Sequence, residues 1–250
     1  MRLCVSAQNN LIGTLPWELS LLTSLQGISL HNNLLSGNIP SQFQSLSRLR
    51  MIQLQSNYLT GTIPYWLFGC QRDTHYDDDR IISNRVSTCS LPDVNIVVLA
   101  ENFFTGTIPS KMPVYSNLIV LDLNGNALTG SIPEELFDFQ APHVGDGGNT
   151  TSTTHGSNDE DETATSMFQL QKLRLFENLF SGNIPTTIGN LLELEILVLS
   201  YNTLSGTIPS QFGQLPKLAF VGISNNEKVS GASSQTGKPR RDLLLLLTDF

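Results

Sequence analysis

Apolar and polar residues alternate along this chain at fixed distances from a recurring Ile-Pro or Leu-Pro step. The stretch LVLSYNTLSGTIP, residues 197–209, shows the spacing, and four of the six intervals between successive steps are 24 residues long. A fixed period of this length with matching residue chemistry predicts a solenoid. The prolines that end the steps are Pro16, Pro40, Pro64, Pro109, Pro133, Pro185 and Pro209.

The apolar offsets predict the parts of each coil. The alternation of Ile28 and Leu30 favours a short strand with both side chains inward. Successive strands are expected to stack into a parallel sheet. After each proline, apolar residues return every third position, as at Phe43, Leu46 and Leu49. This spacing suits a short helical or 3₁₀ return on the convex side, and the predicted fold class is an α/β solenoid.

An asparagine occupies the same offset in every copy. An inward-pointing amide can satisfy backbone groups left unpaired where the chain leaves the strand, and stacked copies would form a ladder. Glycine then permits a bend, and proline fixes φ. The predicted ladder contains Asn33, Asn57, Asn102, Asn126, Asn178 and Asn202.

The full unit, LVLSYNTLSGTIPSQFGQLPKL at residues 197–218, resembles the plant-type leucine-rich repeat. Repeats of this kind form the ectodomains of receptor-like kinases and receptor-like proteins and the polygalacturonase-inhibitor proteins. The resemblance implies a right-handed superhelix whose concave sheet binds a protein, peptide or glycan. It also implies an extracellular or cell-surface location.

The repeat register divides the chain. We expect one solenoid domain over residues 1–231, with about seven repeats and a partial eighth, and a non-repeat tail over 232–250. Two intervals exceed one period, which places insertions at about 71–91 and 140–166. The second insertion is poor in apolar residues and is predicted to be disordered.

Composition excludes several classes of function. The net charge of −8 and the lack of a basic stripe argue against nucleic acid as a partner. No phosphate-binding, hydrolase, zinc-protease or kinase motif occurs, so we expect no enzyme activity and no cofactor. The acidic run at residues 73–79 could hold a hard cation, but we interpret it as a solvated loop and predict no metal site.

The cysteines and a glycosylation sequon predict features that depend on the cellular compartment. Cys4 and Cys70 fall at core offsets, and Cys70 could form a disulfide with Cys89 in an oxidising compartment. Asn149 begins the sequon Asn-Thr-Thr, a possible glycosylation site on a secretory route. No signal peptide or membrane span is expected, so any membrane attachment depends on segments outside this chain.

The outward strand positions form the candidate ligand-binding surface. Several are apolar or aromatic, which is typical of an interface, although neighbouring strands could equally cover them. Phe176 and Tyr201 are the strongest candidates. The full set is His31, Met51, Gln53, Gln55, Asp122, Asn124, Lys172, Arg174, Phe176, Glu177, Val198, Tyr201 and Phe220.

The favoured function is a receptor-like recognition module that binds its ligand on the concave face. Two alternatives remain open at this point. One is a secreted inhibitor of cell-wall glycosidases, and the other is an intracellular interaction scaffold with free thiols and no glycan.

Overall fold

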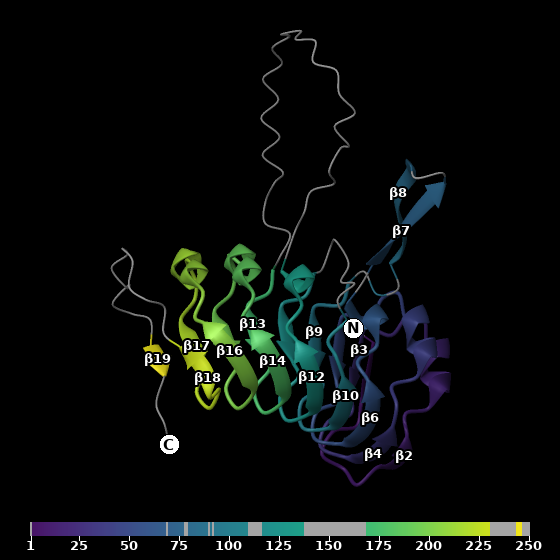
Figure 1. The fold of residues 1–250 in the computed structure, drawn as a ribbon. Helices are drawn as coiled ribbons and strands as arrows, with labels where there is room; N and C mark the ends of the chain where they lie inside the picture. Colours follow the sequence, from purple (N-terminus) through teal and green to yellow (C-terminus); the bar gives the residue numbers. More distant parts are fainter. Residues whose placement is uncertain are drawn as a thin grey trace.

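The computed structural model describes residues 2–68, 70–77, 80–89, 91, 93–109, 117–137, 169–230 and 244–246. Only the backbone is described for residues 68, 70–77, 80–89, 135 and 244–246. The chain winds into successive coils that lie side by side along one axis (Figure 1). The predicted α/β solenoid is therefore confirmed.

A first sheet of parallel strands runs along the concave side of the coils. Its strand order is β1-β3-β5-β9-β11-β13-β15-β17-β19, so each coil adds one strand beside the previous one. Equivalent residues align across the coils, as where Leu121 pairs with Leu173, and Leu173 pairs with Leu197. The strands are Leu3–Val5, Gly27–Ser29, Met51–Gln53, Ile96–Val98, Val120–Asp122, Lys172–Arg174, Ile196–Val198, Phe220–Gly222 and Leu244–Leu246.

A second parallel sheet follows the asparagine of each coil, where the sequence predicted only a bend. Its strand order is β18-β16-β14-β12-β10-β6-β4-β2. Equivalent extended segments from neighbouring coils lie next to each other here, so their backbone groups pair with one another. The strands are Ile12–Thr14, Leu34–Gly37, Tyr58–Thr62, Phe103–Gly106, Ala127–Ser131, Leu179–Asn183, Thr203–Thr207 and Lys228–Ser230.

Short 3₁₀ helices return the chain on the opposite side from the first sheet, as the three-residue spacing predicted. The N-cap prolines that the structure describes are extended, as at Pro40 with φ −61° and ψ 131°. Each helix turns an apolar side chain inward, and Phe43 is fully buried. In the described part the helices are Trp17–Leu21, Ser41–Ser45, Tyr65–Phe68, Glu134–Leu136, Thr186–Asn190 and Ser210–Gln214.

One continuous hydrophobic core fills the space between the two sheets and the 3₁₀ helices. Phe104, Phe137 and Phe180 have no exposed surface, and neither do most of the inward leucines. Full burial of such a side chain contributes about 1.5–3 kcal/mol, so stacking between coils dominates the stability of the fold.

The asparagines lie between adjacent coils and bond to backbone groups of both. Asn57 Nδ2 donates to the carbonyls of Leu30 and Leu54, both at 3.0 Å, and Asn57 Oδ1 accepts the Leu35 N–H at 3.0 Å. Equivalent bonds recur at the other ladder positions and at Asn226. These amides satisfy polar groups that the apolar core would otherwise leave unpaired.

The residue before each ladder asparagine adopts a left-handed backbone conformation. In one coil this residue is Gly125, but elsewhere it carries a side chain, which is uncommon. The reversal turns the following asparagine into the core. The non-glycine positions are Gln8, Asn32, Ser56, Glu101, Glu177, Tyr201 and Asn225, with φ between 52° and 56°.

An antiparallel hairpin forms inside the first insertion and projects from the stacked coils (Figure 1). It consists of β7 (Cys70–Asp77) and β8 (Arg80–Cys89), and its register places Cys70 opposite Cys89. The side chains of both cysteines, and with them the proposed disulfide, lie outside the described residues, as does Asn149. Cys4 packs partly buried against the core.

Candidate functional site

The outward residues of the first sheet form aligned columns. Gln53, Val98, Asp122, Arg174 and Val198 occupy equivalent positions on consecutive strands β5, β9, β11, β13 and β15. The parallel register therefore brings together side chains that are far apart in the sequence.

A cavity of about 360 Å³ opens on this surface and extends over four consecutive coils, those of β5, β9, β11 and β13. Its size falls in the range of about 300–1,000 Å³ that is usual for ligand sites. Six of the residues selected from the sequence line it, namely Gln55, Asp122, Asn124, Arg174, Phe176 and Glu177.

An ion pair forms the floor of this cavity, which we call the concave pocket. Arg174 Nη1 lies 3.3 Å from Asp122 Oδ2, and Asp122 Oδ1 accepts the Asn124 N–H at 3.3 Å. The Asp122 side chain is only 9% exposed, whereas that of Arg174 is 38% exposed. Burial raises the pKa of the Asp122 carboxyl, against the opposing effects of the Asn124 N–H and the Arg174 guanidinium.

Other residues that line the concave pocket provide further hydrogen-bond acceptors. Glu101 is exposed and accepts a hydrogen bond from the Ser56 hydroxyl. Glu177 is also exposed. The Gln55 Oε1 atom is buried and has no hydrogen-bond donor, the one such side-chain atom in the described part of the chain. A buried acceptor without a donor is costly to the stability of the fold.

Phe176 supplies the aromatic surface of the concave pocket. Its backbone N–H donates to Asn124 Oδ1 at 3.1 Å, which fixes the segment after β13 against the neighbouring coil. The ring is partly buried, so one part packs against the protein and another remains available to a ligand.

The remaining selected residues lie on the same sheet but outside the concave pocket. Tyr201 is 50% exposed. His31 Nδ1 lies 3.0 Å from the hydroxyl of Ser29, which also donates to Gln53 Oε1 at 3.3 Å. Met51, Lys172, Val198 and Phe220 are partly buried.

Two selected residues are more buried than outward strand positions should be. Asp122 is 7% exposed and Asn124 is 8% exposed, because side chains of adjacent coils cover them on the concave surface. Coverage by neighbouring strands, which the sequence left open for the outward positions, therefore applies to this pair, and both residues line the pocket.

Five lining residues were missed by the sequence selection. A signal existed for two of them, since Glu101 and Gly125 occupy the same repeat offset as Glu177 and Tyr201. The others are short apolar side chains in outward columns, which the sequence alone did not distinguish from covered positions. The missed residues are Val98, Ala100, Glu101, Val120 and Gly125.

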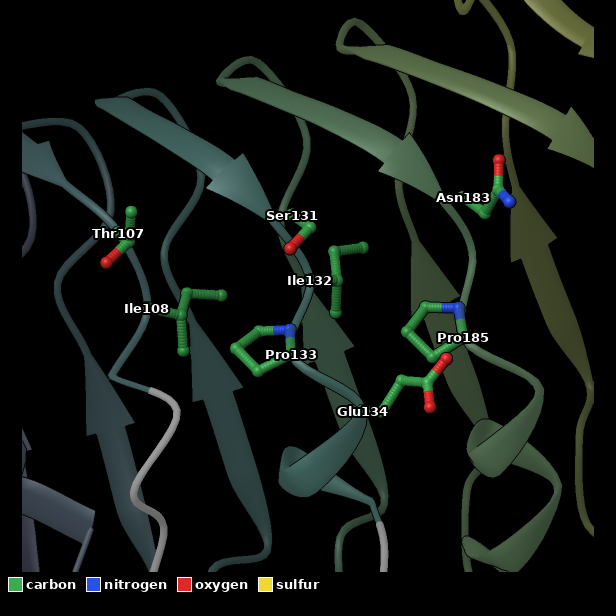
Figure 2. A pocket seen from close by; sticks show the side chains of 8 residues that line it. All are labelled: Thr107, Ile108, Ser131, Ile132, Pro133, Glu134, Asn183 and Pro185. Atoms are coloured by element: carbon green, nitrogen blue, oxygen red, sulfur yellow. The ribbon is translucent and has the colours of Figure 1, made fainter.

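A second cavity of about 510 Å³ lies beside the second sheet, where three successive coils leave β10, β12 and β14. Figure 2 shows Glu134 pointing from the middle coil towards Pro185 of the next. Glu134 is the only charged residue that lines it, so this cavity has fewer charged groups that could bind a ligand than the concave pocket has. Its lining is Thr107, Ile108, Ser131, Ile132, Pro133, Glu134, Asn183 and Pro185.

The described residues contain no group of three or more His, Cys, Asp or Glu side chains placed to hold a metal ion. Across the same residues, no helix has the length and apolar character to cross a membrane.

Comparison with known proteins relates parts of this chain to leucine-rich repeats. The Leucine Rich Repeat family model matches residues 24–46, 117–139, 169–191 and 193–215. No curated protein sequence matches the chain.

Solved structures of plant receptor ectodomains share the fold. The ectodomain of the Arabidopsis thaliana membrane receptor kinase GASSHO1/SCHENGEN3, in complex with CASPARIAN STRIP INTEGRITY FACTOR 2, is 31% identical with a TM-score of 0.70. That match covers 94% of this chain and 22% of the other. A TDR receptor is 30% identical with a TM-score of 0.64, over 88% of this chain and 30% of the other.

The Arabidopsis receptor kinase HAESA, in complex with the peptide hormone IDA and the co-receptor SERK1, is 25% identical with a TM-score of 0.66. This match covers 90% of our chain and 30% of HAESA. The chain thus spans between about a fifth and a third of the length of these relatives. It contains leucine-rich repeats and folds as a leucine-rich-repeat solenoid, similar to the ectodomains of plant receptor kinases.

Proposed function

We propose that this chain is a recognition module that binds a peptide along the outward face of its first sheet. The observation that carries the proposal is the concave pocket, which four coils line and which contains an aromatic ring and an ion pair. The peptide hormone IDA in complex with HAESA supports the same class of ligand.

The physical basis is a rigid surface with varied side chains. Backbone pairing between coils and the asparagine bonds hold the outward columns in register, so little ordering is required when a ligand binds. An extended peptide laid across the strands would contact several coils at once. Because no known catalytic motif occurs in the sequence, we infer a recognition role rather than an enzymatic one.

Affinity selection from a random-sequence peptide library on the immobilised chain tests this function. We expect selected peptides to bind the wild type and to bind Phe176→Ala at least about tenfold more weakly, as for a contact worth roughly 1.4 kcal/mol or more. The matched control is Phe103→Ala, which removes an exposed aromatic ring from the second sheet and should leave the affinity unchanged.

Thermal unfolding of both variants checks that they remain folded. An empty selection, or equal affinity of the selected peptides for wild type and Phe176→Ala, contradicts the proposal. The glycosidase-inhibitor alternative stays a prediction, and a polygalacturonase assay with added protein tests it. The intracellular scaffold also stays a prediction.

A further inference from the structure

The concave pocket has an excess of negative charge. Three carboxylates line it, those of Glu101, Asp122 and Glu177, against one cation, Arg174. The arginine is already paired with Asp122. Among the ion pairs of the described residues, none involves Glu101 or Glu177. Two carboxylates therefore face the cavity without a cationic partner.

The hydrogen-bonding groups of the concave pocket also favour a cationic ligand group. The two unpaired carboxylates accept hydrogen bonds only. A group that satisfies both must carry several N–H donors. Arginine has five donors in a planar fork and lysine has three, and neither side chain has an acceptor.

The other walls suit the carbon stem of such a side chain. Val98, Ala100 and Val120 contribute apolar surface between the polar groups. Phe176 adds an aromatic ring, and a cation over an aromatic face gains a further attraction. Long basic side chains bury their methylene groups while the charged end keeps its polar partners.

We propose that the concave pocket is a subsite for a basic side chain of the bound peptide, with arginine favoured over lysine. The cation lies near Glu101 and Glu177, and its carbon stem packs against Phe176. This inference rests on the proposed peptide-binding function, which it deepens by naming the chemistry of one ligand residue.

The main alternative is that the concave pocket binds a negatively charged group of the ligand. Arg174 could instead attract a carboxylate of a ligand, since its side chain is 38% exposed. An anion there would approach Glu101 and Glu177. The charge balance therefore favours a cation.

Three small probes with blocked ends test the subsite directly: N-acetylarginine methylamide, N-acetylcitrulline methylamide and N-acetylaspartate methylamide. Citrulline has nearly the shape of arginine but no charge. Titration followed by protein NMR is expected to show arginine binding about tenfold or more tightly than citrulline, because charge-assisted hydrogen bonds are lost. Glu101→Gln and Glu177→Gln should each remove most of this preference. Glu134→Gln, which neutralises the acid of the second cavity, is the matched control and should not alter it.

Equal binding of arginine and citrulline, or tighter binding of aspartate, overturns the subsite. The outcome is separable from that of the proposed function. Selected peptides that depend on Phe176 but contain no recurrent basic residue would leave the function standing and remove the subsite. Selective arginine binding with an empty peptide selection would remove the peptide-binding function and retain the pocket chemistry.

Discussion

Arg174 and Asp122 are 52 residues apart in the sequence, yet Arg174 Nη1 lies 3.3 Å from Asp122 Oδ2. The pair exists because β11 and β13 are neighbours in the first sheet, with Asp122 directly opposite Arg174. More than one period of sequence lies between the two strands, but the sheet register is the same as between ordinary repeats. The solenoid therefore fixes the geometry of the concave pocket independently of the second insertion.

Asp122 should make stability depend on pH in a defined direction. Burial raises the pKa of its carboxyl above the ordinary value of 3.8, so the folded state holds the proton more tightly than the unfolded state. The contribution of this residue to the free energy of unfolding falls as pH rises from 3.8 through the folded-state pKa. Urea unfolding across this range should show that the free energy of unfolding of Asp122→Asn rises relative to that of the wild type as pH increases.

The matched control for this experiment is Asp93→Asn. Asp93 belongs to an exposed pair with Arg50 at 3.9 Å, where the two side chains are 48% and 55% exposed. Asp93→Asn should change the free energy of unfolding by less than about 1 kcal/mol, because exposed pairs contribute little. A pH-independent difference for Asp122→Asn would show that burial does not control this carboxyl.

Ladder asparagines should contribute to the free energy of unfolding only where two coils enclose them. Asn57→Ala leaves the Leu35 N–H and the Leu30 and Leu54 carbonyls without the amide, at about 1–3 kcal/mol for each group left unpaired. We expect a loss of roughly 3 kcal/mol or more in chemical denaturation. Asn9 occupies the same offset in the first coil but is exposed, so Asn9→Ala should cost less than about 1 kcal/mol. Similar losses for both would argue against the inter-coil role.

Adjacent phenylalanines give a direct test of the core. Phe104 has no exposed surface, and Phe104→Ala should destabilise the fold by about 3–5 kcal/mol. Phe103 is 55% exposed and stacks on Tyr58, with ring centroids 5.9 Å apart. Phe103→Ala should cost no more than about 1.5 kcal/mol. Denaturation midpoints for the two variants measure the difference, and a reversed order would mean that the register of β10 is wrong.

Gly206 is required by its backbone conformation. Its φ is +79°, and an added Cβ would lie 2.5 Å from Asn183 Oδ1 at the tip of an exposed side chain of the preceding coil, which can move aside. Gly206→Ala should therefore lose about 1–2 kcal/mol from the left-handed backbone. Gly213 has no atom within 4 Å of an added Cβ and no positive φ, so Gly213→Ala should be neutral or slightly stabilising. Equal thermal midpoints would contradict this account of the turn.

Much of the fold could be predicted from the sequence because the repeat itself encodes it. The alternation around Ile28 gives the strand, and the common offset of residues such as Asn57 and Asn102 gives the stacking order. The second sheet could not be predicted, since its pairing depends on neighbouring coils coming close together after each asparagine. No alternation within a single copy indicates this.

The candidate site was only partly predictable, for a related reason. The register identified outward residues such as Arg174 and Phe176, but curvature and neighbouring side chains decide which of them remain accessible. Asp122 is buried by adjacent coils, and Gln55 Oε1 lacks a donor only because of how its surroundings pack. Such properties arise between coils and are absent from the sequence of any one coil.

Photo-crosslinking of a library-selected peptide to the wild-type chain, with the attachment sites located by mass spectrometry, tests the central claim most directly. We predict attachment within residues 98–101, 120–125 and 174–177, which belong to three of the four coils that line the concave pocket. Attachment confined to the second sheet, around Tyr58 and Phe103, would contradict peptide recognition by the concave face.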